Sequence, residues 1–325
     1  MTLALRTVIV LSMVTAALPA AATTLPSDDL LAARFFAELV AQSIKQKLLP
    51  GSEQAGQGVR AIAPPLVPKF TVDGCEVLQW DRNRFSKLSL YINRPGKYCL
   101  DQDYESFCSP FEHGCPGPVI DIRASDVDVD FRGHTVSASG AGVDGYGQNI
   151  RIHNGRIDGA GVGIHLSDKG HSPSAAYPIL PVKVNDVFTD TGFVIESMQF
   201  VDVRKAIMLS GRGNLVRDNT ISAIFNKQDS TLVHFALLSY GPAARIERNT
   251  FRLKGLAPGF NGYAMYLRSA DGTIVGNNTV RTGFSNTGTI GVGLSNTNGV
   301  MLQANEFSTE TDTVLDAGSS LNGRD

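Results

Sequence analysis

Two aspartates and one histidine stand at corresponding places in three successive apolar stretches of the sequence. Asp121, Asp144 and His165 each follow a β-branched apolar residue in a short run that is typical of a strand. Side chains alternate across a strand, so all three are predicted on the outer face. Neighbouring strands lie about 4.8 Å apart, which would place the three groups about 5–10 Å from one another.

Paired carboxylates at such separations are what glycoside hydrolysis needs. In such enzymes a neighbouring carboxylate raises the pKa of one acid and poises it as a proton donor. Asp121, Asp144 and His165 are therefore the predicted catalytic group. A solvated face also carries Asp, Arg and His without any chemistry, so a plain surface ion pair remains the alternative.

Cations beside the predicted catalytic group broaden the chemistry. Arg123 follows Asp121 on the same face, and Lys169 opens the long segment after His165. Either cation can neutralise the carboxylate of a uronate sugar in a lyase. The carboxylates of Asp121 and Asp144 can also hold Ca²⁺ through their oxygens, so the cofactor question stays open.

A second cluster of residues suits sugar binding. Lys205, His234 and Tyr263 precede three successive predicted strands, and Tyr266 and Arg268 follow Tyr263 closely. Aromatic faces stack on sugars, and cations suit polyanionic chains. His234, Tyr266 and Arg268, with Arg123 and Lys169, are the predicted substrate-binding residues.

The elements that position these residues follow from a repeat. Asn219, Asn249, Asn278 and Asn305 stand in four similar phrases separated by 30, 29 and 27 residues (249−219, 278−249, 305−278). A period of this size indicates a solenoid. The apolar residues around each Asn are mostly β-branched or aromatic and alternate with polar ones, which predicts short strands. Asn tolerates the left-handed conformation of a tight corner, and stacked Asn side chains can form a ladder. We therefore expect an all-β chain folded as a parallel β-helix.

Aligning the strands by their inward apolar residues predicts two outward columns. In the strand after His234, Ala236 and Leu238 are taken as inward and Leu237 as outward. The first column is then Asp121, Asp144, His165, Met208, Leu237, Tyr266 and Gly293. The second is Arg123, Tyr146, Ser167, Ser210, Ser239, Arg268 and Ser295.

Three stretches in the middle of the chain resemble a known family. Asp128–Val136, Asn149–Ile157 and Gly161–Ile164 are similar to right-handed parallel β-helix repeat proteins of the pectate-lyase-like superfamily. The resemblance covers roughly Leu88 to Ser308 and implies a right-handed β-helix. This fold carries lyases, hydrolases, epimerases, tailspikes and adhesins, so it implies no single activity. The catalytic motifs of the polygalacturonase, alginate-epimerase and pectate-lyase types are absent from the sequence.

The N-terminal part predicts export. Residues 1–22 are typical of a signal peptide: Arg6, an apolar run from Val8 to Leu18, and Ala20 to Ala22 as the cleavage site. The apolar run is too short for a membrane span, although a retained anchor is the alternative. We expect a secreted or periplasmic protein. A net charge of −2 without basic runs argues against nucleic acid as a partner.

Four cysteines lie between the signal and the repeats. In an exported chain, Cys75, Cys99, Cys108 and Cys115 predict two disulfides that staple residues 69–118, the entry region and first irregular coil. Three pairings are possible. We favour Cys75–Cys99 and Cys108–Cys115, because the latter two flank a short loop. A zinc site is the rival, but only His113 lies near these cysteines.

The remaining segments complete the domain plan. Residues 23–68 are predicted as an N-terminal helix, Ser27 to Leu49, followed by a linker. Residues 119–310 are the predicted β-helix, and residues 311–325 a polar tail. The tail either folds over the last coil or leaves an open end that self-associates.

Function classes follow from this plan. The favoured hypothesis is an enzyme acting on a polysaccharide as a lyase, glycoside hydrolase or epimerase. The alternatives are a non-catalytic polysaccharide-binding or surface scaffold, and an assembly protein that stacks through its ends.

Overall fold

The computed structural model describes residues 71–79, 89–106, 117–168, 188–225, 234–254, 261–283, 288–316 and 318–324. All of them belong to the compact unit Leu66–Asp325. The predicted signal peptide, helix, linker, Cys108, Cys115 and Lys169 lie outside the described residues. Every element in the described ranges is a β-strand, and none of these ranges contains a helix long and apolar enough to cross a membrane.

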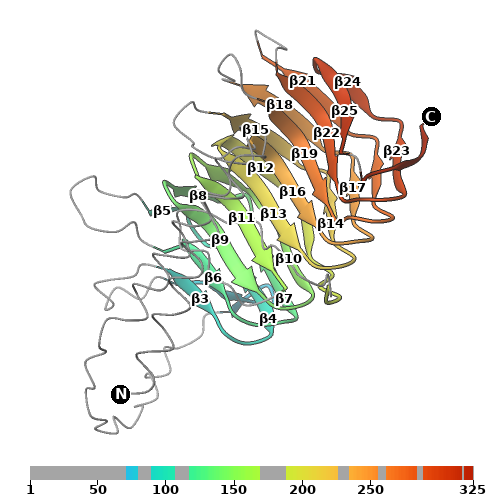
Figure 1. Ribbon diagram of the computed structural model, residues 1–325. Helices are drawn as coiled ribbons and strands as arrows, with labels where there is room; N and C mark the ends of the chain where they lie inside the picture. The colour runs from blue at the N-terminus through green and yellow to red at the C-terminus, as the bar shows by residue number, and fades with distance from the viewer. Residues whose placement is uncertain are drawn as a thin grey trace, which may run out of the picture. The chain divides into compact units, whose positions relative to one another are not determined.

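One sheet of nine parallel strands runs along the unit (Figure 1). Its strands stack in chain order, so each pairs with the strand that the chain supplies one repeat later. The sheet consists of β3 (Leu90–Ile92), β6 (Ile120–Ile122), β9 (Ala141–Tyr146), β11 (Val162–Ser167), β13 (Lys205–Ser210), β16 (His234–Tyr240), β19 (Gly262–Arg268), β22 (Thr289–Ser295) and β25 (Thr311–Leu315).

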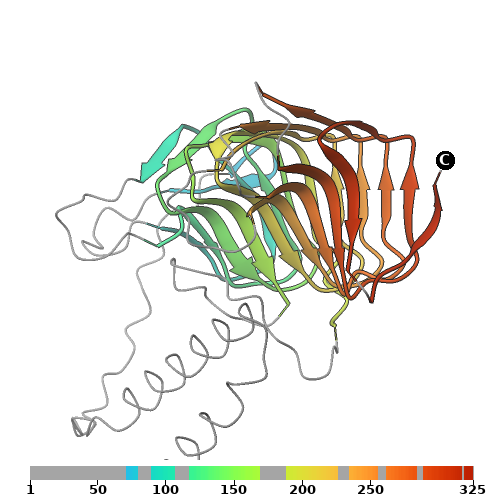
Figure 2. The ribbon, with the colours of Figure 1, turned by 45° about the horizontal axis from the view of Figure 1, so that its top comes forward.

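The second sheet has seventeen strands and joins two parallel ladders through the long strands β10 and β12. Among the described pairings, only that of β1 with β2 is antiparallel. Its strands are β1 (Thr71–Val72), β2 (Cys75–Val77), β4 (Gly96–Cys99), β5 (Tyr104–Ser106), β7 (Val127–Asp130), β8 (Thr135–Ala138), β10 (Ile150–Asp158), β12 (Val194–Val203), β14 (Leu215–Arg217), β15 (Thr220–Ile224), β17 (Arg245–Glu247), β18 (Thr250–Lys254), β20 (Ile274–Gly276), β21 (Thr279–Thr282), β23 (Val300–Gln303), β24 (Glu306–Ser308) and β26 (Leu321–Arg324). In Figure 2 the strands of both sheets follow one another from the blue-green to the red end.

A continuous apolar core lies between the sheets. The largest fully buried side chains include Phe131, Phe193, Phe200 and Phe251. One core cluster extends from Leu78 to Leu302 and takes side chains from both sheets. Burial of the apolar side chains along this continuous core holds successive layers in register.

The nine-stranded sheet departs from simple alternation at a repeated pair of residues. In six of its strands a Gly or Ala is followed by a larger apolar residue, and both are buried. These pairs are Gly142-Val143, Gly163-Ile164, Ala206-Ile207, Ala236-Leu237, Ala264-Met265 and Gly291-Val292. At Gly163 an added Cβ would lie 2.4 Å from the carbonyl oxygen of Ala206, so only a hydrogen fits there.

This pair corrects one predicted register. Ala236 and Leu237 both belong to the core cluster, whereas Leu238 packs with Met208 and Phe235 in a separate cluster. Leu238, not Leu237, pairs with Tyr266 in the outward column. The prediction that Leu237 faces outward is therefore wrong by one residue. Tyr240 consequently takes the place predicted for Ser239.

The asparagine ladder is present as predicted. Asn249 Oδ1 accepts hydrogen bonds from the backbone N–H (3.1 Å) and the side-chain amide (2.9 Å) of Asn219. Asn278 accepts the same two bonds from Asn249 at 2.9 and 3.0 Å, and Asn305 accepts them from Asn278 at 3.0 Å. Asn219, Asn249 and Asn278 are at most 2% exposed, so the ladder satisfies buried polar groups.

The ladder residues do not themselves adopt the left-handed conformation that we expected of them. The positive φ angles belong to the residues just before them: Asp218 (57°), Arg248 (54°), Asn277 (54°) and Ala304 (49°). The chain therefore turns one residue earlier, with an outward-facing side chain at the corner. Turning there leaves the following Asn to point inward and pair with its neighbours.

The two ends of the described unit each hold a predicted feature. Cys75 and Cys99 form a disulfide, which confirms that pairing. At the other end, β25 and β26 lie within residues 311–325, the predicted polar tail, and pair in parallel with β22 and β23. The tail therefore extends both sheets by another layer.

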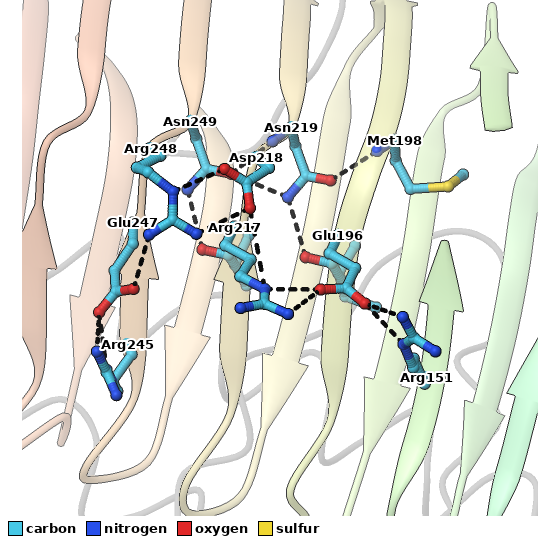
Figure 3. Close-up of polar contacts among 12 residues, drawn as sticks. Arg151, Glu196, Met198, Arg217, Asp218, Asn219, Arg245, Glu247, Arg248 and Asn249 are labelled. Atoms are coloured by element: carbon cyan, nitrogen blue, oxygen red, sulfur yellow. Dashed lines mark hydrogen bonds and ion pairs between the residues drawn. The ribbon is translucent and has the colours of Figure 1, made fainter. Parts of the chain in front are cut away.

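A row of alternating charges runs over the outer face of the second sheet (Figure 3). Glu196 is 6% exposed and lies between Arg151 and Arg217. Arg151 Nε donates to Oε1 at 2.6 Å, and Arg217 Nε donates to Oε2 at 2.6 Å. Burial alone would raise the pKa of Glu196, but the hydrogen bonds from the two arginines outweigh it and lower that pKa.

We expect Asn249→Ala to lower the free energy of unfolding by about 3 kcal/mol, because it removes the acceptor of the backbone N–H and side-chain amide of Asn219 and the donor to the carbonyl of Val216, all of them buried. Urea denaturation of the mature protein measures this loss. Thr220→Ala, at an exposed position of the same sheet, is the control and should cost less than about 0.5 kcal/mol. Equal losses in the two variants would contradict a stabilising ladder.

We expect Glu196→Gln to destabilise the protein by about 2 kcal/mol at pH 7, since two charged hydrogen bonds are weakened. The pKa of Glu196 is lower in the folded state. Its contribution is therefore fully present above the ordinary value of 4.5 and is lost as the pH falls through the folded-state pKa. The difference between wild type and variant should shrink below about pH 4.5 in urea titrations, with Glu105→Gln as an exposed control. A difference that stays constant down to low pH would contradict the ion pairs.

Candidate functional site

The predicted catalytic group is brought together on the outer face of the nine-stranded sheet. Asp121 pairs with Asp144, Asp144 with His165, and His165 with Met208. This confirms that the three side chains occupy one column on the adjacent strands β6, β9 and β11. The predicted alignment of the middle strand is confirmed because its inward residue Val143 pairs with Ile120 and Ile164.

Asp144 is the centre of this group. Its Oδ1 lies 2.7 Å from Nδ1 of His165, and its Oδ2 accepts a hydrogen bond of 3.1 Å from Nη2 of Arg123. Arg123 Nε lies 2.6 Å from Oδ1 of Asp121. Asp144 is 2% exposed, so its carboxylate contacts His165 and Arg123 and is shielded from solvent.

This geometry assigns different chemistry to the three residues. Both oxygens of Asp144 are engaged, so it can orient His165 but cannot approach a substrate. A carboxylate only accepts hydrogen bonds, so Nδ1 of His165 carries the proton and Nε2 is the basic nitrogen. Nε2 has no hydrogen-bond partner in the described part of the chain. His165 is thus the group of the three that can exchange a proton with a bound molecule.

Arg123 separates the two carboxylates that sequence analysis took as a pair. Its guanidinium contacts both Asp121 and Asp144, so one positive charge is shared between two negative ones. Among the described residues, no three His, Cys, Asp or Glu side chains are grouped to hold a metal ion. Arg123 itself lies where a Ca²⁺ shared by the two aspartates would bind.

Two exposed tyrosines flank the group, and sequence analysis did not select either as a site residue. Tyr91 pairs with Asp121 and is 55% exposed. Tyr146 is 36% exposed, and the guanidinium of Arg123 lies 4.9 Å from its ring centroid. The signal that could have identified them is their place in the same outward columns as the acids.

The second predicted cluster lies farther along the same face. Tyr266 packs against Tyr263 at 5.2 Å and stacks on Phe235 at 6.4 Å between ring centroids. Arg268 lies 5.7 Å from the ring centroid of Tyr240. Burial raises the pKa of Tyr263, and the neighbouring Tyr266 raises it further, so its hydroxyl stays protonated at neutral pH.

His234 does not join this cluster on the outer face. It is 4% exposed and lies 5.9 Å from the ring of Phe225, a core residue. Phe235, and not His234, is the residue paired with Tyr263. The ammonium of Lys205 accordingly lies over the ring of Phe235 at 5.6 Å.

The two clusters are separated on the sheet. Met208 and Leu238 occupy the two strands between His165 and Tyr266. Three strand spacings place Tyr266 about 14 Å from His165. The structure therefore groups Asp121, Arg123, Asp144 and His165 closely, and it places Tyr266 and Arg268 as a separate aromatic and cationic surface.

Comparison with known proteins gives no family for this chain. No protein-family model matches the sequence, and the search of curated proteins finds no match either. The function must therefore be argued from the geometry of the site.

We expect His165 to be fixed in the tautomer that carries its proton on Nδ1, because Asp144 accepts that hydrogen bond. Nitrogen-15 NMR of the imidazole rings above the titration range measures the tautomer directly. Asp144→Ala should release His165 to a mixture of tautomers, whereas His134, far from the site, should show no change. An Nε2-protonated ring in the wild-type protein would contradict the orientation.

Proposed function

We propose that this chain is an exported right-handed parallel β-helix protein that binds a polysaccharide on the outer face of its nine-stranded sheet. We further propose that His165 transfers a proton to or from the bound sugar.

The β-helix is supported by the way the strands pair. Strands separated by one repeat stack in parallel in both sheets, and the two sheets share one core. A solenoid that passes once per repeat through the nine-stranded sheet and through each of the two ladders of the second sheet produces this pattern. Right-handed crossovers between parallel strands are strongly preferred, which supports the right-handed form and agrees with the resemblance to the pectate-lyase-like superfamily.

Export is supported by the disulfide. Cys75 and Cys99 are bonded, and disulfides persist mainly outside the reducing cytoplasm. The signal peptide predicted for residues 1–22 agrees with this location. An exported protein meets polysaccharides of cell surfaces and surroundings, which fits the proposed substrate class.

The observation that carries the catalytic proposal is the buried carboxylate of Asp144 holding His165. The arrangement leaves Nε2 of a mostly buried imidazole without a hydrogen-bond partner in the described part of the chain, and the adjacent strand β9 carries the exposed ring of Tyr146. Amphipathic aromatic rings suit a sugar, which presents both C–H and hydroxyl groups. His165 would then lie at the bound chain with its basic nitrogen free.

Proton abstraction from carbon fits this site better than two-carboxylate hydrolysis. Hydrolysis requires two carboxyl groups that act on one bond, and here both aspartates contact Arg123. A uronate lyase instead needs one base. His165 would take the C5 proton, the C4–C5 double bond would form, and the C4–O bond would break with its electron pair on the leaving oxygen, which water protonates.

A non-catalytic binding surface is the second candidate. It is favoured by the closed set of contacts from Asp121 through Arg123 and Asp144 to His165, which also stabilises the face as a rigid platform. Tyr91 and Tyr146 would then bind the polysaccharide without turnover.

The test is a screen of the mature protein against polyuronides and neutral polysaccharides, following unsaturated products by ultraviolet absorbance and new reducing ends. We expect turnover of a polyuronide that falls at least about 100-fold in His165→Gln. His134→Gln, a matched substitution in the turn between β7 and β8 of the other sheet, should retain activity within about twofold.

Binding measurements separate the two candidates. Turnover that survives His165→Gln would overturn the catalytic role. If no polymer is converted but one is bound, and binding weakens in Tyr146→Ala, the scaffold candidate stands. Absence of both turnover and binding for every polymer would reject the proposed function altogether.

A further inference from the structure

Two arginines face each other on the outer side of the second sheet, away from the site described above. Arg252 on β18 pairs directly with Arg281 on β21. Both side chains are exposed, and the residues flanking Arg252, Phe251 and Leu253, are buried in the core. The two guanidinium groups therefore extend from neighbouring strands on the same face.

Neither arginine makes an ion pair or a hydrogen bond within the described ranges. Like charges directly opposite each other in a sheet are destabilising. Many other arginines of the described unit, including those exposed on the second sheet, are balanced by carboxylates. Examples are Arg94 with Glu76, Arg132 with Asp73, Arg156 with Asp158, Arg212 with Asp190, Arg245 with Glu247, and Arg248 with Asp218. The pair Arg252 and Arg281 is thus an exception to the charge balance of this surface.

The surroundings of the pair are polar. Ser222 and Ser308 extend the same row on either side. The outward residues two positions earlier, Thr250 and Thr279, are also paired. Lys254 lies on the same strand as Arg252 and is 3.2 Å from Asp202, so its charge is balanced. The large hydrophobic side chains that are exposed in the described unit, Tyr91, Tyr146, Val314 and Leu315, belong to the other sheet.

We propose that Arg252 and Arg281 form a binding site for the carboxylate or sulfate group of an acidic glycan. The planar fork of each guanidinium matches such an oxyanion with two parallel hydrogen bonds. An oxyanion between the two forks removes the repulsion that the folded chain leaves uncompensated. The flanking hydroxyls of Thr250 and Thr279 can hydrogen-bond to sugar hydroxyls, and a row without apolar side chains has nothing to insert into a lipid bilayer.

This site goes beyond the proposed function because it lies on the other sheet and involves none of its residues. It would hold an acidic chain on the protein independently of His165. The two surfaces can therefore be separated by substitution.

The test is calorimetric titration of the mature protein with an oligouronate of defined length. We expect Arg252→Gln and Arg281→Gln each to weaken binding at least tenfold. Arg245→Gln is the matched control: it removes the same charge from the same sheet at an exposed but ion-paired position, and it should change binding less than twofold. A His165→Gln variant should also bind normally at this site.

Each other outcome decides against the site. If Arg245→Gln weakens binding as much as Arg252→Gln, only net charge matters and the site is rejected. Loss of binding in His165→Gln alone would place the glycan at the other face. Equal binding of the neutral oligosaccharide, or stronger binding to anionic lipid vesicles than to the oligouronate, would overturn the glycan assignment.

A thermal unfolding series provides a readout that does not depend on affinity. Without ligand, Arg252→Gln should unfold at the same temperature as wild type or higher, because repulsion is removed. The oligouronate should raise the midpoint of wild type more than that of Arg252→Gln. Arg252 would be only a structural residue if Arg252→Gln unfolded at a lower temperature than wild type without ligand and its midpoint rose as much as that of wild type with the oligouronate.

Discussion

Parallel stacking in register is the constraint on which the rest of this structure depends. Each side chain lies about 4.8 Å from the side chain at the same position of the next strand. A residue type that recurs at one position of the repeat therefore contacts its own kind in the next layer. Apolar residues gain from this, because it builds one continuous core. A buried amide also gains, since Asn249 can donate to one neighbour and accept from the other. A charge does not, because its equivalent in the next layer repels it.

The outer faces show how the chain handles that problem. On the second sheet, His153, Glu196, Arg217 and Glu247 follow one another across successive strands, so most neighbours attract. On the nine-stranded sheet, Asp121 and Asp144 are adjacent, and Arg123 lies between their carboxylates. The closeness of two acids, which in the sequence suggests a catalytic pair, is thus used here to bind an arginine. Arg252 and Arg281 are adjacent without such a counter-charge.

Sequence analysis could predict what repeats and could not predict what departs from the repeat. The spacing of the Asn residues is sufficient to predict the ladder. The β-branched residue that precedes each of Asp121, Asp144 and His165 is sufficient to place these three side chains in one column. Leu237 was misplaced because strict alternation was assumed, whereas Ala236 and Leu237 are both inward. The small residue before the large one was the available signal, and it recurs in six strands. The contacts of Arg123 depend on side-chain conformations, which no pattern of residue types encodes.

Two histidines beside aspartates illustrate why geometry, and not residue type, distinguishes a candidate site from a structural contact. His153 is 7% exposed; its Nε2 lies 2.8 Å from Asp128, and its Nδ1 is buried 3.8 Å from Asp130. One ring nitrogen is thus engaged by a carboxylate and the other is shielded from solvent, so neither is open to an external molecule. His165 has one nitrogen held by a buried carboxylate and the other without a partner, on a face with exposed tyrosines. Proton transfer needs that second nitrogen, so the same pair of residue types is structural on one sheet and available for chemistry on the other.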